Sequence, residues 1–125
     1  MNVVDSSGWL EYLTDGANAD FFAAPILDHE NLIIPTICIF EVCKRVLVQF
    51  GEERALETLG SLSSGMTVAL DRQLATEAAL LSAELKLAMA DSIILATAQG
   101  CGATLWTQDA HFKNIAGVQY IEKKV

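Results

Sequence analysis

Apolar residues are arranged in two ways along the chain, in short solid runs and in longer segments with helical spacing. Five apolar runs are predicted to be strands, the last of them weak, at residues 1–5, 32–34, 66–70, 104–107 and 118–121. The segments between them are predicted to be helices, at residues 6–16, 18–29, 36–50, 52–62, 72–84 and 91–99. This alternation indicates an α/β protein, and we expect a three-layer α/β/α sandwich with a central, mostly parallel sheet of about five strands.

Residues that cap or break helices set the predicted boundaries. Ser6 and Asp71 can cap the helices that follow them, and Gly51 suits the end of the helix over 36–50. Pro25 leaves open whether residues 18–29 form one helix or two. With 125 residues, we expect a single domain over residues 1–125.

The segment over residues 87–100 is apolar on nearly every side and carries one carboxylate, Asp91, in its first turn. A helix of this kind is predicted to be buried. An unpaired carboxylate in such surroundings is costly, although a helix N-terminus stabilises an anion. We therefore expect other chemically active residues to share a pocket with Asp91.

Composition narrows the possible classes of protein. The chain is 52% hydrophobic but has no run of eighteen apolar residues, which argues against a membrane span, and its first residues lack a basic or long apolar leader, which favours the cytoplasm. The three cysteines suit buried thiols in a reducing compartment better than zinc or a disulfide. A net charge of −8 argues against a broad nucleic-acid-binding surface, but not against an enzyme that holds phosphates through metal ions and a local basic patch.

Four acidic residues stand out by position. Asp5 follows the first predicted strand and Asp109 follows the fourth, and sites in parallel sheets lie where strands end. Asp91 begins the helix before the fourth strand, so that rule does not place it. Glu41 lies among apolar residues in the helix over 36–50.

Each acid also has a purely structural interpretation. Asp5 and Asp91 can be helix caps, Asp109 can be a turn residue, and Glu41 can pair with Arg45 on a helix surface. If the four converge, their charges must be neutralised by protons or cations. Oxygen ligands alone favour Mg²⁺ or Mn²⁺ over zinc.

Four sequence motifs, taken together, resemble those of PIN-domain ribonucleases, and specifically VapC-type toxins of bacterial toxin–antitoxin pairs. They are V-V-D-S-S at residues 3–7, Glu41, A-D-S-I-I-L-A-T-A at residues 90–98 and T-Q-D-A-H-F at residues 107–112, in the family's order. The resemblance implies a parallel sheet between helices, in agreement with the interpretation above. It also implies a metal-dependent endoribonuclease that hydrolyses RNA phosphodiesters.

The resemblance implies a role for each matching residue. The catalytic acidic quartet corresponds to Asp5, Glu41, Asp91 and Asp109. Asp5, Asp91 and Asp109 would hold Mg²⁺ or Mn²⁺, and Glu41 would complete the ligand shell or orient the attacking water. Two hydroxyl residues, Ser7 and Thr107, would support the carboxylates or the water. His111 is expected to be a turn or packing residue rather than a general acid.

Basic residues near the motifs suggest how RNA approaches an acidic protein. The candidates are Lys44, Arg45, Lys86 and Lys113, which would form a basic rim around the acids or be ordinary solvated charges. The resemblance implies a cognate antitoxin and a homodimer, with a heterotetramer or larger assembly when the antitoxin is bound. No membrane partner is expected.

Other classes fit less well. A phosphatase with an aspartyl nucleophile would need a second aspartate at the position of Ser7, and a phospho-receiver domain would need paired acids that this chain lacks beside Asp5. Two alternatives within the family stay open: a PIN-like binding module that has lost catalysis, and a PIN-type nuclease acting outside a toxin–antitoxin pair.

Overall fold

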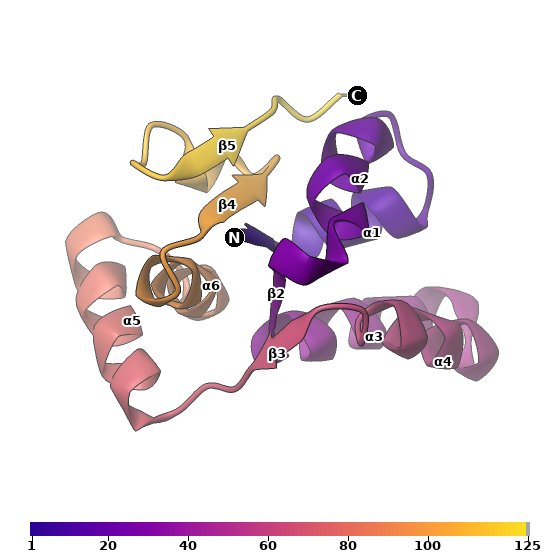
Figure 1. Ribbon diagram of the computed structural model, residues 1–125, viewed down its shortest axis with the longest axis horizontal. Coiled ribbons are helices and arrows are strands. Elements are labelled where there is room, and N and C mark those ends of the chain that lie inside the picture. Colours follow the sequence, from indigo (N-terminus) through magenta and orange to yellow (C-terminus); the bar gives the residue numbers. More distant parts are fainter. Residues whose placement is uncertain (125) are drawn as a thin grey trace.

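A computed structural model describes residues 1–124 and contains one sheet of five strands, all parallel (Figure 1). The strands are β1 (Asn2–Val4), β2 (Leu32–Pro35), β3 (Met66–Val68), β4 (Thr104–Thr107) and β5 (Val118–Tyr120). Their order across the sheet is β3-β2-β1-β4-β5. The predicted α/β class and parallel sheet are confirmed, and the sheet is entirely rather than mostly parallel.

Six α-helices cover the two faces of the sheet. They are α1 (Ser6–Leu13), α2 (Ala19–Leu27), α3 (Thr36–Phe50), α4 (Glu52–Ser61), α5 (Arg72–Leu85) and α6 (Met89–Gly100). Helix α6 packs on one face with α5 outside it, while α1, α2 and most of α3 pack on the other (Figure 1). No helix within residues 1–124 is long and apolar enough to cross a membrane.

Each face of the sheet has its own hydrophobic core, because neighbouring side chains on a strand point to opposite faces. On β1, Val3 packs with Ile94 and Leu95 of α6, whereas Val4 packs with Trp9 and Phe22 of α1 and α2. The middle of α6, residues 92–98, is buried throughout. A strand that is apolar on both sides is therefore what this layered architecture requires.

The order of the strands reverses at β1. The chain moves outward from β1 through β2 to β3, then returns to place β4 on the other side of β1. The register pairs Val4 with Trp106, and the Asp5 N–H continues the ladder with a 3.2 Å hydrogen bond to the Trp106 carbonyl. In open parallel sheets, the crevice at such a reversal is where ligands bind, beyond the carboxyl ends of the strands.

The structure decides two local points that the sequence leaves open. The cap of α1 is Asp5, whose side chain accepts a hydrogen bond from the Gly8 N–H, rather than Ser6, which is the first helical residue. Pro25 does not divide α2, which runs unbroken to Leu27. A proline lacks a backbone N–H, so α2 loses one i→i−4 hydrogen bond at Pro25. The helix continues for only two more residues and tolerates this loss.

Candidate active site

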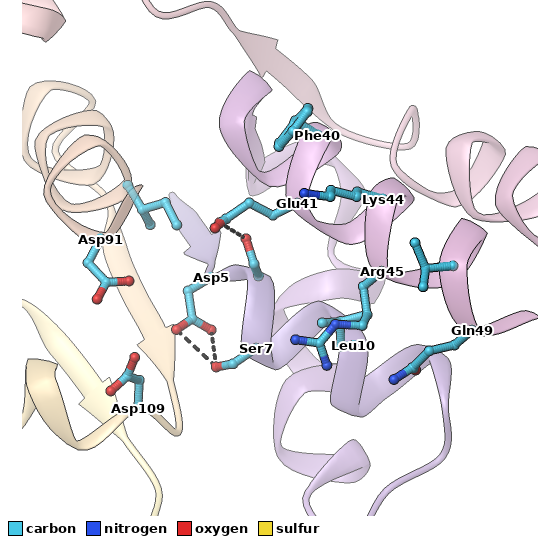
Figure 2. A pocket seen from close by; sticks show the side chains of 13 residues that line it. Asp5, Ser7, Leu10, Phe40, Glu41, Lys44, Arg45, Gln49, Asp91 and Asp109 are labelled. Carbon is cyan, nitrogen blue, oxygen red and sulfur yellow. Dashed lines mark hydrogen bonds between the residues drawn. The ribbon is translucent and has the colours of Figure 1, made fainter. Parts of the chain in front are cut away.

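Asp5, Glu41, Asp91 and Asp109 all line one open pocket of about 580 Å³ (Figure 2). Asp5 directly follows β1, and Asp109 lies two residues after β4. Asp91 lies in the first turn of α6, and α6 runs back across the sheet to the start of β4, which is parallel to β1. The first turn of α6 therefore lies at the edge of the sheet where the strands end. The fold therefore brings together all four acids singled out from the sequence.

Asp5 is the most enclosed of these acids, with 3% of its surface exposed. Its carboxylate accepts hydrogen bonds from the Gly8 N–H at 2.8 Å, the Ser7 hydroxyl at 2.9 Å and the Thr107 hydroxyl at 2.5 Å. Burial raises the pKa of Asp5 to about 6, against the lowering effect of these three donors, and the charge of Asp109 adds to the rise. A cation beside Asp5 would favour its ionised form.

Glu41 is tied to the helix that follows Asp5. The Ser6 hydroxyl donates to Glu41 Oε1 at 2.6 Å, and this bond joins α1 to α3. Within residues 1–124, Glu41 forms no ion pair with Arg45. The alternative of a simple surface pair is therefore wrong.

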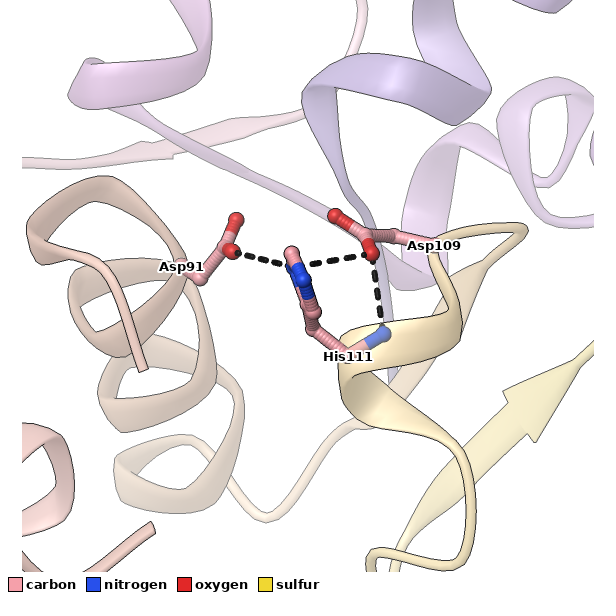
Figure 3. Close-up of side chains that lie close together, drawn as sticks. All are labelled: Asp91, Asp109 and His111. Carbon is pink, nitrogen blue, oxygen red and sulfur yellow. Dashed lines mark hydrogen bonds and ion pairs between the residues drawn. The ribbon is translucent and has the colours of Figure 1, made fainter. Parts of the chain in front are cut away.

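Asp91 and Asp109 face each other with the ring of His111 between them (Figure 3). His111 Nδ1 lies 3.2 Å from Asp109 Oδ1 and 3.8 Å from Asp91 Oδ2. Partial burial raises the pKa of Asp91, the charges of Asp109 and Glu41 raise it further, and His111 opposes them. Asp109 also caps the short 3₁₀ turn Ala110–Phe112, accepting a 2.9 Å hydrogen bond from the His111 N–H.

The structural interpretations of the acids hold for only some of them. Asp5 does cap α1 and Asp109 does shape a turn. Asp91 caps nothing, because α6 begins after Ala88 and Asp91 lies inside its first turn. These local bonds hold the carboxylates of Asp5 and Asp109 in place, so a structural role and a chemical role are compatible at the same residue.

The carboxylates that line the pocket are ligands of the kind that suits a hard divalent cation. Among residues 1–124, none of the four forms an ion pair with lysine or arginine. Ligand atoms of Asp91, Asp109 and His111 lie within 4.8 Å of one another. Carboxylate oxygens at one edge of a pocket, without a paired lysine or arginine among residues 1–124, fit Mg²⁺ or Mn²⁺.

The candidate basic residues fall into two groups. Lys44 and Arg45, on α3, line the same pocket as the acids (Figure 2). Lys86 lies at the C-terminal end of α5, and Lys113 lies over the ring of Tyr120; neither lines that pocket. The positive charge beside the acids therefore comes from one helix.

Two residues of the site had no chemical role in the sequence interpretation. The sequence predicts Ser6 only as a cap and His111 only as a turn or packing residue. His111 does lie in the turn Ala110–Phe112, but its side chain is 75% exposed, so it is not a packing residue. The sequence shows that Asp109 and His111 are two residues apart across a turn, which places their side chains near each other. It does not show that Asp91 lies on the other side of the His111 ring.

The fold and the site together define a class: a parallel α/β domain with an acidic pocket where its strand order reverses. A family model of the PIN domain matches residues 3–118, and the chain belongs to that family. The family resemblance stated from the sequence is thus confirmed.

Solved structures with the same fold cover nearly the whole chain. A toxin–antitoxin complex from Klebsiella pneumoniae has 24% identity and a TM-score of 0.82, over 95% of this chain and 96% of that one. VapC20 of Mycobacterium tuberculosis, described as a toxin that cleaves the sarcin–ricin loop, has 12% identity and a TM-score of 0.76, over 93% and 95%. VapBC2 of Rickettsia felis, bound to promoter DNA, has 16% identity and a TM-score of 0.75, over 97% of each chain. No curated protein sequence matches significantly.

Proposed function

We propose that this protein is a metal-dependent endoribonuclease and the toxin of a toxin–antitoxin pair. The observation that carries this proposal is the convergence of Asp5, Glu41, Asp91 and Asp109 on one pocket without a paired lysine or arginine. The solved structures named above, two of them described as toxins or toxin–antitoxin complexes, support the choice of function.

In this proposal the acids hold the ion and the hydroxyls hold the acids. A bound Mg²⁺ or Mn²⁺ would supply an activated water near neutral pH and would stabilise charge on the phosphoryl oxygens. Asp5 is aligned by Thr107, Ser7 and the Gly8 N–H, so its carboxylate needs little rearrangement to bind the ion. Asp91 and Asp109, which line the same pocket, would be its other carboxylate ligands.

Glu41 and the basic residues of α3 position the substrate and the water. Ser6 holds Glu41 in place on the α3 side of the pocket, where Glu41 would orient the attacking water. Lys44 and Arg45, on the same helix, attract the phosphates next to the one that is cut. A local positive patch of this kind is needed because the net charge of the chain is −8.

The proposed protein partner is an antitoxin that covers this pocket. Two apolar side chains at its rim, Phe40 and Val48, are 61% and 76% exposed. A partner that buries them would also close the approach to the acids. The expected homodimer, the larger assembly with antitoxin and the cytoplasmic location stay predictions.

The direct test is cleavage of total RNA by purified protein with Mg²⁺, Mn²⁺ or EDTA. We expect discrete fragments with a divalent ion, none with EDTA and none with Asp91→Asn. Asp28→Asn, at an exposed position beyond α2, is the matched control and should cut like the wild type. Cleavage that persists in EDTA, or in folded Asp91→Asn, would overturn the assignment.

Expression in a bacterial host tests the toxin part of the proposal separately. Wild-type protein should arrest growth, and Asp91→Asn should not. A protein that cuts RNA with a metal ion in vitro but never affects growth would be a PIN-type nuclease outside a toxin–antitoxin pair. A protein that binds the ion but cuts no RNA would be a binding module.

A further inference from the structure

We propose that His111 is a ligand of the metal ion together with Asp91 and Asp109, and that its nitrogen makes the site prefer Mn²⁺ to Mg²⁺. This inference rests on the proposed function. It goes beyond the carboxylate set, because it assigns a role to His111, whose ring lies between two of the acids (Figure 3).

The geometry of the three side chains is already close to that of a metal site. Neighbouring ligands of an octahedral ion with bonds of about 2.1 Å lie about 3 Å apart. His111 Nδ1 lies 3.2 Å from Asp109 Oδ1 and 3.8 Å from Asp91 Oδ2. Small side-chain rotations would therefore bring all three onto one ion.

The backbone restricts His111 to this place. Its N–H donates to Asp109 Oδ1 at 2.9 Å, and the Asp109 N–H donates to the Thr107 hydroxyl at 2.9 Å. The turn Ala110–Phe112 is anchored by Phe112, which is fully buried. The backbone of His111 is thus held in place, but its side chain is 75% exposed, so packing does not explain why the ring lies between the carboxylates. The ring is also free to rotate toward an ion.

The chemistry of the nitrogen decides which ion benefits. Mg²⁺ prefers oxygen ligands and keeps much of its water, whereas first-row transition ions accept imidazole readily. A site of two carboxylates and one imidazole therefore gains affinity for Mn²⁺ without a matching gain for Mg²⁺. A nearby imidazole can also act only as a counter-charge to Asp91 and Asp109, and the experiment must separate these roles.

Pulsed electron paramagnetic resonance of bound Mn²⁺ separates them without measuring activity. Protein purified without a histidine tag is loaded with Mn²⁺, and coupling of the ion to a directly bound nitrogen is recorded. We expect a ¹⁴N signal that changes to a ¹⁵N signal when only the histidines are ¹⁵N-labelled. The signal should vanish in His111→Ala and persist in His29→Ala, which alters the other histidine, exposed and outside the pocket.

Titrations of the same proteins measure the preference between ions. His111→Ala should bind Mn²⁺ at least about tenfold more weakly, the size of effect that loss of an outer-shell partner already has. Its affinity for Mg²⁺, measured by competition, should change much less. His29→Ala should match the wild type for both ions.

The outcomes distinguish this inference from the proposed function. Wild-type protein that binds Mn²⁺ with no histidine nitrogen coupling overturns the role of His111 but leaves a carboxylate metal site. Equal losses of Mn²⁺ and Mg²⁺ affinity in His111→Ala overturn the proposed preference. Wild-type protein that binds neither ion overturns the metal site itself, and with it the proposed function. Labelled His29→Ala protein, in which His111 is the one remaining histidine of the sequence, answers the question even if His111→Ala fails to fold.

Discussion

The Thr107 hydroxyl donates a 2.5 Å hydrogen bond to Asp5 Oδ2, although 102 positions separate the two residues in the chain. The bond exists because β1 and β4 are parallel neighbours, so their carboxyl ends lie side by side. Thr107 also accepts a hydrogen bond from the Asp109 N–H at 2.9 Å. One buried hydroxyl therefore aligns two of the proposed metal ligands.

Replacing Thr107 with valine should weaken both the fold and the site. The change keeps the shape of the side chain but removes the donor to a buried carboxylate, which should lower the free energy of unfolding by about 1.5–3 kcal/mol. RNA cleavage should also fall, because Asp5 loses its alignment. Denaturant unfolding and cleavage assays check this, with Thr104→Val on the same strand as the control. A loss of equal size in both variants would show that the hydroxyl bond is unimportant.

Asp5 should make the metal-free protein less stable as the pH rises. Its pKa is raised from 3.8 to about 6, so between these values the folded state keeps a proton that the unfolded state has released. The stabilisation from this proton is complete below pH 3.8 and is lost as the pH rises through about 6. At about 1.4 kcal/mol per unit, the difference is about 3 kcal/mol.

Unfolding experiments in EDTA across this pH range test the role of Asp5. Asp5→Asn should flatten the decline in the free energy of unfolding, since the amide does not titrate. Asp15→Asn is the control, because it removes a carboxylate from an exposed turn whose φ of 53° asparagine also adopts. This variant should show the same decline in the free energy of unfolding as the wild type. An unchanged slope in Asp5→Asn would contradict the raised pKa.

The four candidate basic residues should separate into two pairs in RNA binding. Lys44 and Arg45 line the acidic pocket, whereas Lys86 and Lys113 do not. In an inactive Asp91→Asn background, Lys44→Ala or Arg45→Ala should weaken binding and reduce the salt slope by about 0.7 per lost phosphate contact. Lys86→Ala and Lys113→Ala serve as charge-matched controls. Fluorescence anisotropy at several salt concentrations measures the slopes, and identical slopes for all four variants would rule out the assignment to α3.

Two glycines should respond to alanine in opposite directions. A Cβ on Gly8 would lie 2.6 Å from Phe22 Cε1 and 2.7 Å from Val4 Cγ1, in the core beside Asp5. Gly8→Ala should therefore lower the free energy of unfolding by about 1–3 kcal/mol. Gly60 lies in α4 with nothing within 4 Å of a Cβ, so Gly60→Ala should raise it by about 0.5–1 kcal/mol. Denaturant unfolding of both variants checks whether the free energy of unfolding falls in Gly8→Ala and rises in Gly60→Ala.

The elements predicted best from the sequence have strong local signals at both ends. The bounds of α3 match the prediction because Pro35 precedes it and Gly51 follows it. Burial of α6 was predictable because the segment is apolar around its circumference. The cap of α1 was not, because Asp5 and Ser6 are adjacent and both suit the position, and only the path of the backbone after β1 decides between them.

Partners of the site residues depend on contacts between elements that are distant in the sequence. Glu41 faces either Arg45 on its own helix or Ser6 on another, and helical spacing permits the first while tertiary packing produces the second. The same holds for His111, whose place between Asp91 and Asp109 depends on how α6 meets the turn after β4.

Periodicity and motifs are local properties of a chain, so they were enough to predict the layered α/β architecture, the family and the four candidate acids Asp5, Glu41, Asp91 and Asp109. That these carboxylates share one pocket, that Ser6, Thr107 and His111 contact them, and that Lys44 and Arg45 are the basic residues beside them became visible only in the folded chain. Hydrogen bonds and charge interactions depend on distances of a few ångströms, and these are set by the packing of strands and helices that are far apart in the sequence.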